Sequence, residues 1–294
     1  MRNGLTLDGA AVTLLDGTVA FVSPRLAAVG TQTLGGTGSI VFGGTGDSGR
    51  VTASSGSTLT IGAQMLITGS RDGVVGVLGA VVNEGEIAAD TSGVQIDVTG
   101  PSVVNRGTMR AVNGGFIMTG SFVNEGTVAI GSGTSGFRVL SANYVQTGGV
   151  TTISGGSLRA NLIDIRGGTF SGFGTIHGPL KNAALLEIGG SGTAGTLQVN
   201  GTFEQTATGV LVMELGGTAT SQYDRLNITG AATLLGRLRI EMIGGFVPAP
   251  ADSFTILAFA SHSGELDEIE GLDLGGGRLL SPTVLATQIR LTAS

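Results

Sequence analysis

The chain has 294 residues, enough for one large β domain or two smaller ones. It contains 54 glycines but only 6 prolines and no Gly-X-Y period, which excludes collagen, while 41% hydrophobic and 12% charged residues argue against disorder. The net charge of −6 and the low aromatic content of 4% disfavour nucleic-acid binding. Cysteine is absent, which excludes disulfides, Cys-ligated metals and a cysteine nucleophile.

Short strands are predicted from the N-terminus onwards. Residues 5–9 (LTLDG) and 38–43 (GSIVFG) are apolar stretches that end in glycine turn signals. Residues 1–28 have an apolar bias interrupted by two aspartates, unlike a signal peptide, and no run of 18 apolar residues follows. We therefore expect any targeting segment to lie outside this chain. No stretch has helical apolar spacing with a cap, so we expect very little helix.

A repeat of about 20 residues organises the middle of the chain. The hexapeptide VNEGEI that starts at Val82 returns as VNRGTM and as VNEGTV, so Asn83, Asn105 and Asn124 follow one another at separations of 22 and 19 residues. Looser echoes follow at residues 145–148, 180–183 and 203–206. A fixed period of this length is typical of a stacked-repeat architecture.

The predicted fold is all-β: a right-handed parallel β-helix, or solenoid, with coils of about 20 residues. Each coil would have two or three strands, with Val, Ile, Leu, Phe and Met inside and Gly or Asn at corners that need a positive φ. The strands lengthen after residue 216. We predict a parallel β-helix over residues 1–215, with N-terminal coils in 1–45, and a C-terminal β cap or small β-sandwich-like assembly module over 216–294.

Three sets of motifs resemble known bacterial surface proteins. They are the VN-x-G repeats, the QTLGGTG segment at residues 32–38, and the LVMELGG and QYDRLNITG segments at 211–217 and 222–230. Together they resemble the β-helical passenger regions of autotransporters and of filamentous-haemagglutinin-like proteins. The resemblance covers nearly the whole chain and implies an extracellular or bacterial cell-surface location. Its motifs are folding motifs and specify no activity.

The series Asn83, Asn105 and Asn124 is the most regular polar feature. These amides could form a ligand-binding row on one face. They could instead form an internal ladder, in which each side chain bonds the backbone at a corner and stacks on the next. The apolar flanking residues and the glycine two places on favour the structural ladder.

An acidic run near the C-terminus is the densest charge cluster and a weak candidate for Ca²⁺. Its members are Glu265, Asp267, Glu268, Glu270 and Asp273. A solvated loop or strand face is the favoured interpretation. Residues 43–49 (GGTGDSG) resemble a calcium-roll turn, but the motif occurs once and its Asp falls one place early, so we interpret it as a plain turn. His177 and His262 have no second ligand at metal or triad spacing. We predict no cofactor and no metal.

The favoured function is that of a non-enzymatic extracellular structural or adhesive β-solenoid, which self-assembles head-to-tail into filaments or into a surface or biofilm-matrix layer. Its partners would be further copies of itself, with surface glycans or other cells as additional candidates; nucleic acid and membrane insertion are not expected. The alternative is a carbohydrate-active β-helix enzyme, a polysaccharide lyase or hydrolase, because the fold does not decide function. Such an enzyme would need carboxylates with Lys or Arg converging in a groove on one coil face.

Head-to-tail assembly requires an open strand edge. The N-terminal residues enter a strand pattern with no helix to cover the end of the solenoid, and an uncovered edge is a template for pairing. The N-terminal coil would then either be cut from a longer rod or receive another copy by strand addition, and we favour the second alternative. The candidate donated strand comprises Thr287, Gln288, Ile289, Arg290, Leu291 and Thr292.

Overall fold

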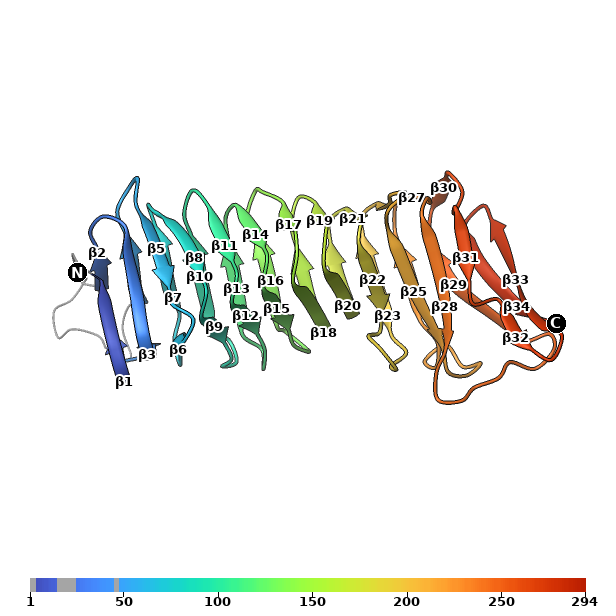
Figure 1. The fold of residues 1–294 in the computed structure, drawn as a ribbon, viewed down its shortest axis with the longest axis horizontal. Helices are drawn as coiled ribbons and strands as arrows, with labels where there is room; N and C mark the ends of the chain where they lie inside the picture. The colour runs from blue at the N-terminus through green and yellow to red at the C-terminus, as the bar shows by residue number, and fades with distance from the viewer. Residues whose placement is uncertain (1–3, 15–24, 45–47) are drawn as a thin grey trace. The chain divides into compact units, whose positions relative to one another are not determined.

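The computed structural model describes residues 4–14, 25–44 and 48–294. These residues form strands and turns without any helix, and the strands build a parallel β-solenoid of about nine turns with about 23 residues per turn (Figure 1). The predicted fold class is confirmed, with turns slightly longer than the predicted 20 residues. Within the described ranges there is thus no helix of the length and apolarity needed to cross a membrane.

The chain divides into two compact units. The first comprises Met1–Thr151 and Gly156–Asn161, and the second comprises Thr152–Gly155 and Leu162–Ser294. The strand β18 (Val150–Arg159) contains residues of both. Each unit stacks its own coils by parallel strand pairing.

In the first unit, coils contribute strands to three parallel rows. The first row is β2 (Arg25–Ala28), β4 (Gly49–Ala53), β7 (Gly73–Val77), β10 (Gln95–Thr99), β13 (Phe116–Thr119) and β16 (Gly136–Val139). The second is β5 (Thr58–Ile61), β8 (Ala80–Asn83), β11 (Val103–Asn105), β14 (Phe122–Asn124) and β17 (Tyr144–Gln146). The third is β6 (Met65–Gly69), β9 (Glu86–Ala89), β12 (Thr108–Ala111) and β15 (Thr127–Ile130). At the N-terminal side, β1 (Leu5–Leu14) pairs with the long strand β3 (Gln32–Phe42), which also pairs with β5 and β6.

The period-2 alternation of each strand places its apolar residues inside the coil. In β11, for example, Val103 and Asn105 are fully buried while Val104 between them is half-buried and faces outward. Aromatic residues add to the same interior: the ring of Phe122 lies 5.0 Å from that of Phe137 and 5.1 Å from that of Tyr144. The core of the unit is therefore a continuous stack of inward-facing side chains.

The glycine two places after each ladder asparagine is required by close approach between coils. A Cβ atom on Gly107 would lie 2.1 Å from the carbonyl oxygen of Gly85, and one on Gly126 would lie 2.3 Å from that of Gly107. The predicted positive φ is therefore wrong at the VN-x-G corners, whereas glycines in other turns, such as Gly93 and Gly114, do have it. None of the three ladder asparagines has a positive φ, whereas Asn113, outside the ladder, has φ 55°.

The second unit repeats the same arrangement of three rows. One row is β20 (Thr169–His177), β23 (Thr196–Asn200), β26 (Arg225–Ile228) and β29 (Ser253–Ala258). Another is β19 (Ile163–Ile165), β21 (Leu180–Asn182), β24 (Phe203–Gln205), β27 (Ala231–Thr233) and β30 (Ser261–Ser263). The last is β22 (Leu185–Ile188), β25 (Val210–Leu215), β28 (Arg237–Met242) and β31 (Glu268–Glu270), and β22 also pairs with the beginning of β20.

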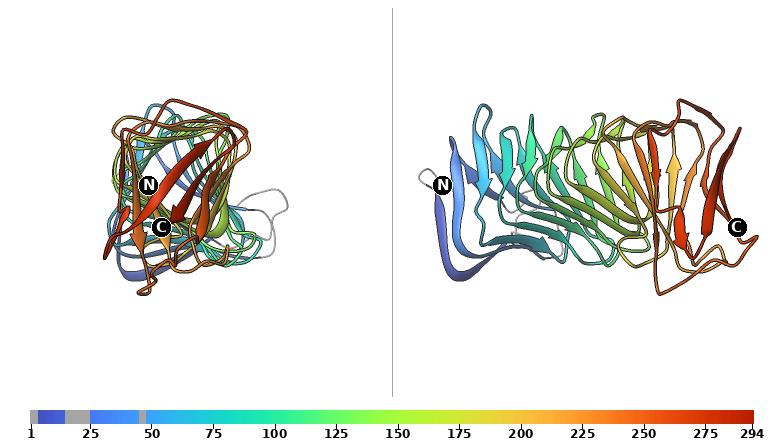
Figure 2. Two further views of the ribbon diagram at one scale, coloured as in Figure 1. Left: turned by 90° about the vertical axis from the view of Figure 1, so that its right-hand side faces the viewer. Right: turned by 45° about the vertical axis from the view of Figure 1, so that its right-hand side comes forward.

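The C-terminal cap is shorter than predicted. Parallel pairing continues beyond residue 216 as far as β31, and the strands that pair only in antiparallel fashion are β32 (Asp273–Gly275), β33 (Arg278–Leu285) and β34 (Gln288–Ala293). These strands form the red end of the second unit in Figures 1 and 2. The longer strands after residue 216 are therefore mostly further coils of the solenoid, and the antiparallel cap is a hairpin added to β29.

Candidate functional site

The three repeated asparagines lie directly above one another in the second row of the first unit. Asn83, Asn105 and Asn124 are Cα partners on β8, β11 and β14, and all three are fully buried. The Nδ2 of Asn83 donates to the Oδ1 of Asn105 at 2.8 Å, and the Nδ2 of Asn105 donates to the Oδ1 of Asn124 at 2.8 Å. Each Nδ2 also reaches a backbone carbonyl, for example that of Thr127 at 2.9 Å from Asn105. These amides hold coils together and are not available to a ligand.

The ladder has members that the asparagine repeat alone did not identify. Gln146 continues it on β17, where its Oε1 accepts from Thr151 at 2.5 Å, and Asn182 and Gln205 form a corresponding step in the second unit at 3.1 Å. All three lie in the looser echoes of the repeat. An Asn or Gln at the position that corresponds to the repeated asparagine is the sequence signal by which they could be found. At the other end, the Oδ1 of Asn83 is buried without a donor among the described residues, because its neighbour on β5 is Ile61.

The acidic run is used in local contacts on several elements. The Oδ2 of Asp267 accepts from the backbone of Gly236 at 2.8 Å, Glu270 pairs with Arg237 at 3.3 Å, and Asp273 accepts from the backbone of Gly275. Glu265 lines a cavity, and Glu268 is the first residue of β31, which belongs to a parallel row. Across the described residues, no three Asp, Glu, His or Cys side chains converge in a way that could hold a metal ion.

The predicted assembly strand is not an open edge. Residues 288–293 form β34, which pairs antiparallel with β29 on one side and with β33 on the other. Ile289 and Leu291 are fully buried, and Thr287 lies in the turn before the strand. Both edges of the strand are thus occupied within its own chain, which removes it as the donated strand.

The two histidines lie apart in the second unit. His177 ends β20, where its Nδ1 lies 3.5 Å from the Nδ2 of Asn200. His262 lines a cavity of about 400 Å³ together with Glu265, and its Nδ1 is buried without a partner among the described residues. Its position beside Glu265 differs from the isolated histidine that the sequence predicts. The glycine-rich segment at residues 43–49, which we interpret as a plain turn, includes Asp47, and this residue lies outside the described residues.

Carboxylates and arginine meet on the third row of the first unit, as an enzyme of the alternative class would require. Arg110 contacts Glu86 through its Nε and Asp90 through its Nη2, the latter at 3.0 Å. These contacts raise the pKa of the Arg110 guanidinium, chiefly through the hydrogen bond to Glu86. The charges are engaged with one another across successive coils, so the cluster is an inter-coil ion-pair network.

A column of valines runs along the outside of the second row. Val82, Val104, Val123 and Val145 are Cα partners in successive strands, and each is half-buried. We call these four residues the valine column. In the second unit, the middle residues of β19, β21 and β24 are instead charged: Asp164, Lys181 and Glu204.

Charged residues border the valine column two places after each valine of β8, β11 and β14, directly beyond the end of the strand. Glu84, Arg106 and Glu125 are exposed, and Arg106 donates to Glu125 at 2.9 Å. This contact raises the pKa of the Arg106 guanidinium. The first unit therefore presents a narrow aliphatic stripe beside an alternating row of charges, which is the composition of an interaction surface with an apolar centre and a polar rim.

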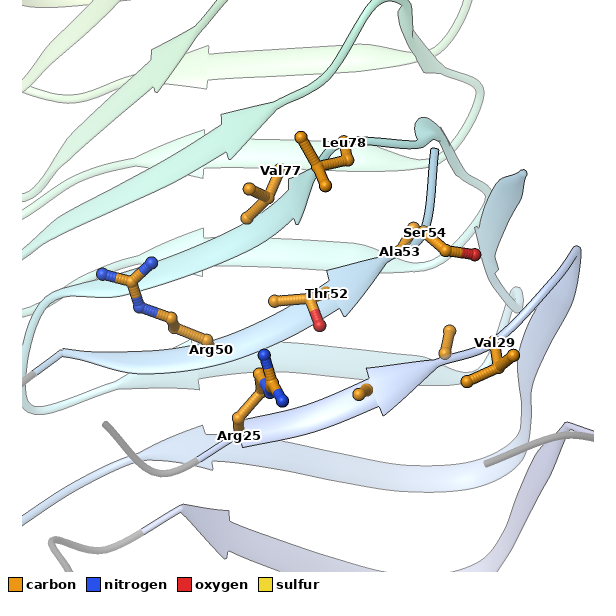
Figure 3. Close-up of a pocket in the computed structure, with 10 residues that line it drawn as sticks. Arg25, Val29, Arg50, Thr52, Ala53, Ser54, Val77 and Leu78 are labelled. Carbon is orange, nitrogen blue, oxygen red and sulfur yellow. The ribbon is translucent and has the colours of Figure 1, made fainter. Parts of the chain in front are cut away.

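A groove of about 300 Å³ lies on the first row of the same unit, over β2, β4 and β7 (Figure 3). Its floor consists of small residues: Ala27 and Thr52 are Cα partners on β2 and β4, and Thr52 is in turn the Cα partner of Gly76 on β7. Apolar side chains border one end, where Val29 is 54% exposed and Leu78 is 62% exposed. We call this feature the arginine groove, because Arg25 and Arg50 line its other end.

Backbone strain shapes the apolar end of the arginine groove. Gly76 and Val77 are consecutive residues with φ of 97° and 79°. A positive φ is a genuine outlier for a β-branched residue and costs on the order of 1–3 kcal/mol. Gly76 must be glycine, because a Cβ there would lie 2.0 Å from the carbonyl oxygen of Thr99. The left-handed step ends β7 and places Val77 and Leu78 on the lining of the groove.

The electrostatic end of the groove is a pair of like charges. Arg25 and Arg50 are Cα partners on β2 and β4, so their backbones are about 4.8 Å apart. Like charges directly opposite each other in a sheet are destabilising. Within the part of the chain that the structure describes, neither arginine forms an ion pair, whereas Arg106 and Arg110 each pair with an acid one coil away.

Two acids are buried beneath a glycine-rich loop of the second unit. The carboxylate of Asp224 accepts from the backbone of Gly195 and of Glu214, each at 2.8 Å, and the Oε1 of Glu214 accepts from Gly192 at 2.7 Å. Burial raises the pKa of Asp224 to about 8, and the two backbone hydrogen bonds offset only part of this rise. The pair anchors the loop to β25.

In comparisons with known proteins, no family model matches the chain and no curated protein matches its sequence.

Proposed function

We propose that this chain is a non-enzymatic structural or adhesive protein of a bacterial surface or extracellular matrix, and that copies associate side by side through the valine column. The repeats' resemblance to passenger regions of surface proteins supports the location. The observation that carries the association is the outward stack of Val82, Val104, Val123 and Val145 beside alternating charges. This replaces the head-to-tail mode, since β34 is paired on both edges.

The partner is a second copy in the opposite orientation. A two-fold axis along the strand direction, midway between β11 and β14, would place Val104 against Val123 of the second copy and Val82 against its Val145. The same axis brings Arg106 opposite Glu125 of the second copy, and Glu125 opposite its Arg106. An isologous contact of this kind is self-complementary in both its apolar stripe and its charges.

The test is the concentration dependence of mass for a variant with Val104→Lys and Val123→Lys, measured by sedimentation velocity. Buried unpaired lysines oppose the contact, so we expect the variant to stay monomeric at concentrations where the parent chain associates. The matched control carries Thr108→Lys and Thr127→Lys, which add the same charge to the same two coils on the third row. The control should associate like the parent.

A charge swap tests the orientation. Arg106→Glu alone places two acids opposite each other and should weaken association, and adding Glu125→Arg should restore it, because the swapped pair is again complementary. A parent chain that is monomeric at all concentrations contradicts the proposal. Equal loss of association in the valine variant and the threonine control also contradicts it.

A further inference from the structure

The arginine groove exists because one outward column holds unusually little side-chain volume. Ala27 and Thr52 of its lining lie side by side on β2 and β4, Thr52 is the Cα partner of Gly76 on β7, which has no side chain, and Figure 3 shows Thr52 between the arginines and the apolar residues. The hollow is therefore part of the strand register. It does not depend on a loop conformation.

The two ends of the groove have opposite character. Arg25 and Arg50 supply two guanidinium groups without an acid partner among the described residues, while Val29, Val77 and Leu78 supply aliphatic surface. Guanidinium groups bind carboxylate, sulfate and phosphate in bidentate geometry. The positive φ of Val77 is a strained conformation that places aliphatic side chains at this end of the groove. The apolar part of a ligand could pack against them.

We propose that the arginine groove binds a small anionic amphiphile, with its acidic head on Arg25 and Arg50 and a short aliphatic body over Ala27, Val77 and Leu78. The volume of about 300 Å³ is at the small end of ligand sites, which favours a single short chain. Among the described residues that line the groove, no aromatic side chain is present on which a sugar ring could stack. Two adjacent positive charges select against a neutral ligand, and the aliphatic end selects against a bare inorganic anion.

The experiment is a titration of the full chain with sodium octanoate, followed by isothermal calorimetry and by the methyl NMR signals of Val77 and Leu78. Acetate supplies the head alone and octanol the body alone. Because the two ends of the groove contribute together, we expect each of these to bind at least about tenfold more weakly than octanoate. A variant with Arg25→Ala and Arg50→Ala should lose at least about tenfold in octanoate affinity. Leu78→Ser, at an exposed position, should weaken octanoate without changing acetate.

The chain offers a matched control for the arginines. Arg138 and Arg159 are also Cα partners, on β16 and β18 of the same unit, and neither lines the groove. A variant with Arg138→Ala and Arg159→Ala removes the same charge and should bind octanoate like the parent. Thermal melts of both double variants establish that each is folded.

The source of the amphiphile is distinguished by vesicles of phosphatidylglycerol. Cosedimentation that requires Arg25 and Arg50 would identify a lipid headgroup as the natural anion, and octanoate binding without cosedimentation would identify a free amphiphile. Absence of octanoate binding up to millimolar concentration would overturn the proposal. Equal loss in the Arg138 and Arg159 control would overturn it too, since binding would then follow net charge. The groove lies within a single copy of the chain, so each of these measurements can be made on the monomer. Their outcome is therefore independent of the proposed self-association.

Discussion

The buried amide of Asn105 makes three hydrogen bonds inside the first unit. Its Nδ2 donates to the Oδ1 of Asn124 and to the carbonyl of Thr127, and its Oδ1 accepts from Asn83. A side chain of similar volume without these groups would take one acceptor from Asn83 Nδ2, which keeps the carbonyls of Gly85 and Thr108, and would take the donor away from the Oδ1 of Asn124 and the carbonyl of Thr127. The residue is therefore a polar connection between three coils in an otherwise apolar interior.

We expect Asn105→Leu to destabilise the chain although leucine is more apolar. Each buried polar group left without a partner costs about 1–3 kcal/mol, and dispersion from the leucine side chain offsets only part of this. Urea unfolding followed by circular dichroism measures the change. The control is Asn143→Leu at an exposed position of the same unit, which should stay within about 0.5 kcal/mol. An unchanged midpoint for Asn105→Leu would mean that the ladder contributes nothing to stability.

Sequence reasoning could find Asn83, Asn105 and Asn124 because an identical motif recurs around them. It gave Gln146, Asn182 and Gln205 no role, since glutamine and changed neighbours obscure the repeat although the amide chemistry persists. The strain at Val77 had no sequence signal either. Nothing in a Gly-Val dipeptide states that both residues adopt a positive φ, because the conformation is imposed by the fold around them.

Successive strands of one row come so close at the VN-x-G corner that a methyl group has no room. Because a Cβ on Gly107 would lie 2.1 Å from the carbonyl oxygen of Gly85, a backbone shift between two coils is needed to accept it. We expect Gly107→Ala to destabilise the chain by about 1–3 kcal/mol, the usual range for overpacking. The thermal midpoint measures this.

Gly148→Ala is the matched control for that corner. Its Cβ would lie 4.0 Å from the nearest atom, the carbonyl oxygen of Glu125, and this glycine has no positive φ. Replacing it should leave the midpoint unchanged or raise it, because alanine lowers the conformational entropy of the unfolded chain. This effect stabilises a protein by about 0.4–1 kcal/mol. Equal effects of the two substitutions would show that glycine at the corner serves flexibility instead of close approach.

At the level of elements, the sequence indicated strands correctly but did not indicate their neighbours. The alternation around Ile289 and Leu291 predicts a strand with one buried face, and β34 is such a strand. Its partners, β29 and β33, depend on where the chain turns back, which alternation does not encode. The valine column was hidden for the same reason, since the outward residue of each VN motif is known only after the register of β8, β11 and β14 is fixed.

Over the whole molecule, net charge and buried acids both favour acid pH, the first for association between copies and the second for folding. The formal charge of −6 and the isoelectric point near 4.9 mean that repulsion between copies decreases as the pH approaches 5. Burial raises the pKa values of Asp97, Glu187 and Asp224, so ionising these groups opposes folding. Stability and self-association should thus both increase towards acid pH, and each must be measured where the other does not interfere.

We expect the free energy of unfolding of the second unit to fall as the pH rises from 5 to 9. The folded pKa of Asp224 is about 8 and its ordinary value is 3.8, so between these values the folded chain holds one proton more than the unfolded chain. Linkage then makes stability decrease with rising pH, by at most about 1.4 kcal/mol per unit for one group. Fluorescence of Tyr223, which is buried against Phe254, reports this unit when Tyr144→Phe removes the other tyrosine.

The variant Asp224→Asn distinguishes the contribution of Asp224 to the pH dependence of stability from that of the other titrating groups. The amide cannot ionise, so the slope of stability against pH should flatten by the contribution of Asp224, even though replacing an acceptor that binds the Glu214 N–H lowers stability at every pH. Dilute solutions keep association from contributing to the measurement. If the parent chain and the Asn variant show the same slope, the two backbone hydrogen bonds outweigh burial and the carboxylate is ionised throughout this range. In that case the Asp224 carboxylate holds the loop as an anion, and a gain in the stability of this unit towards acid pH would come from Glu187.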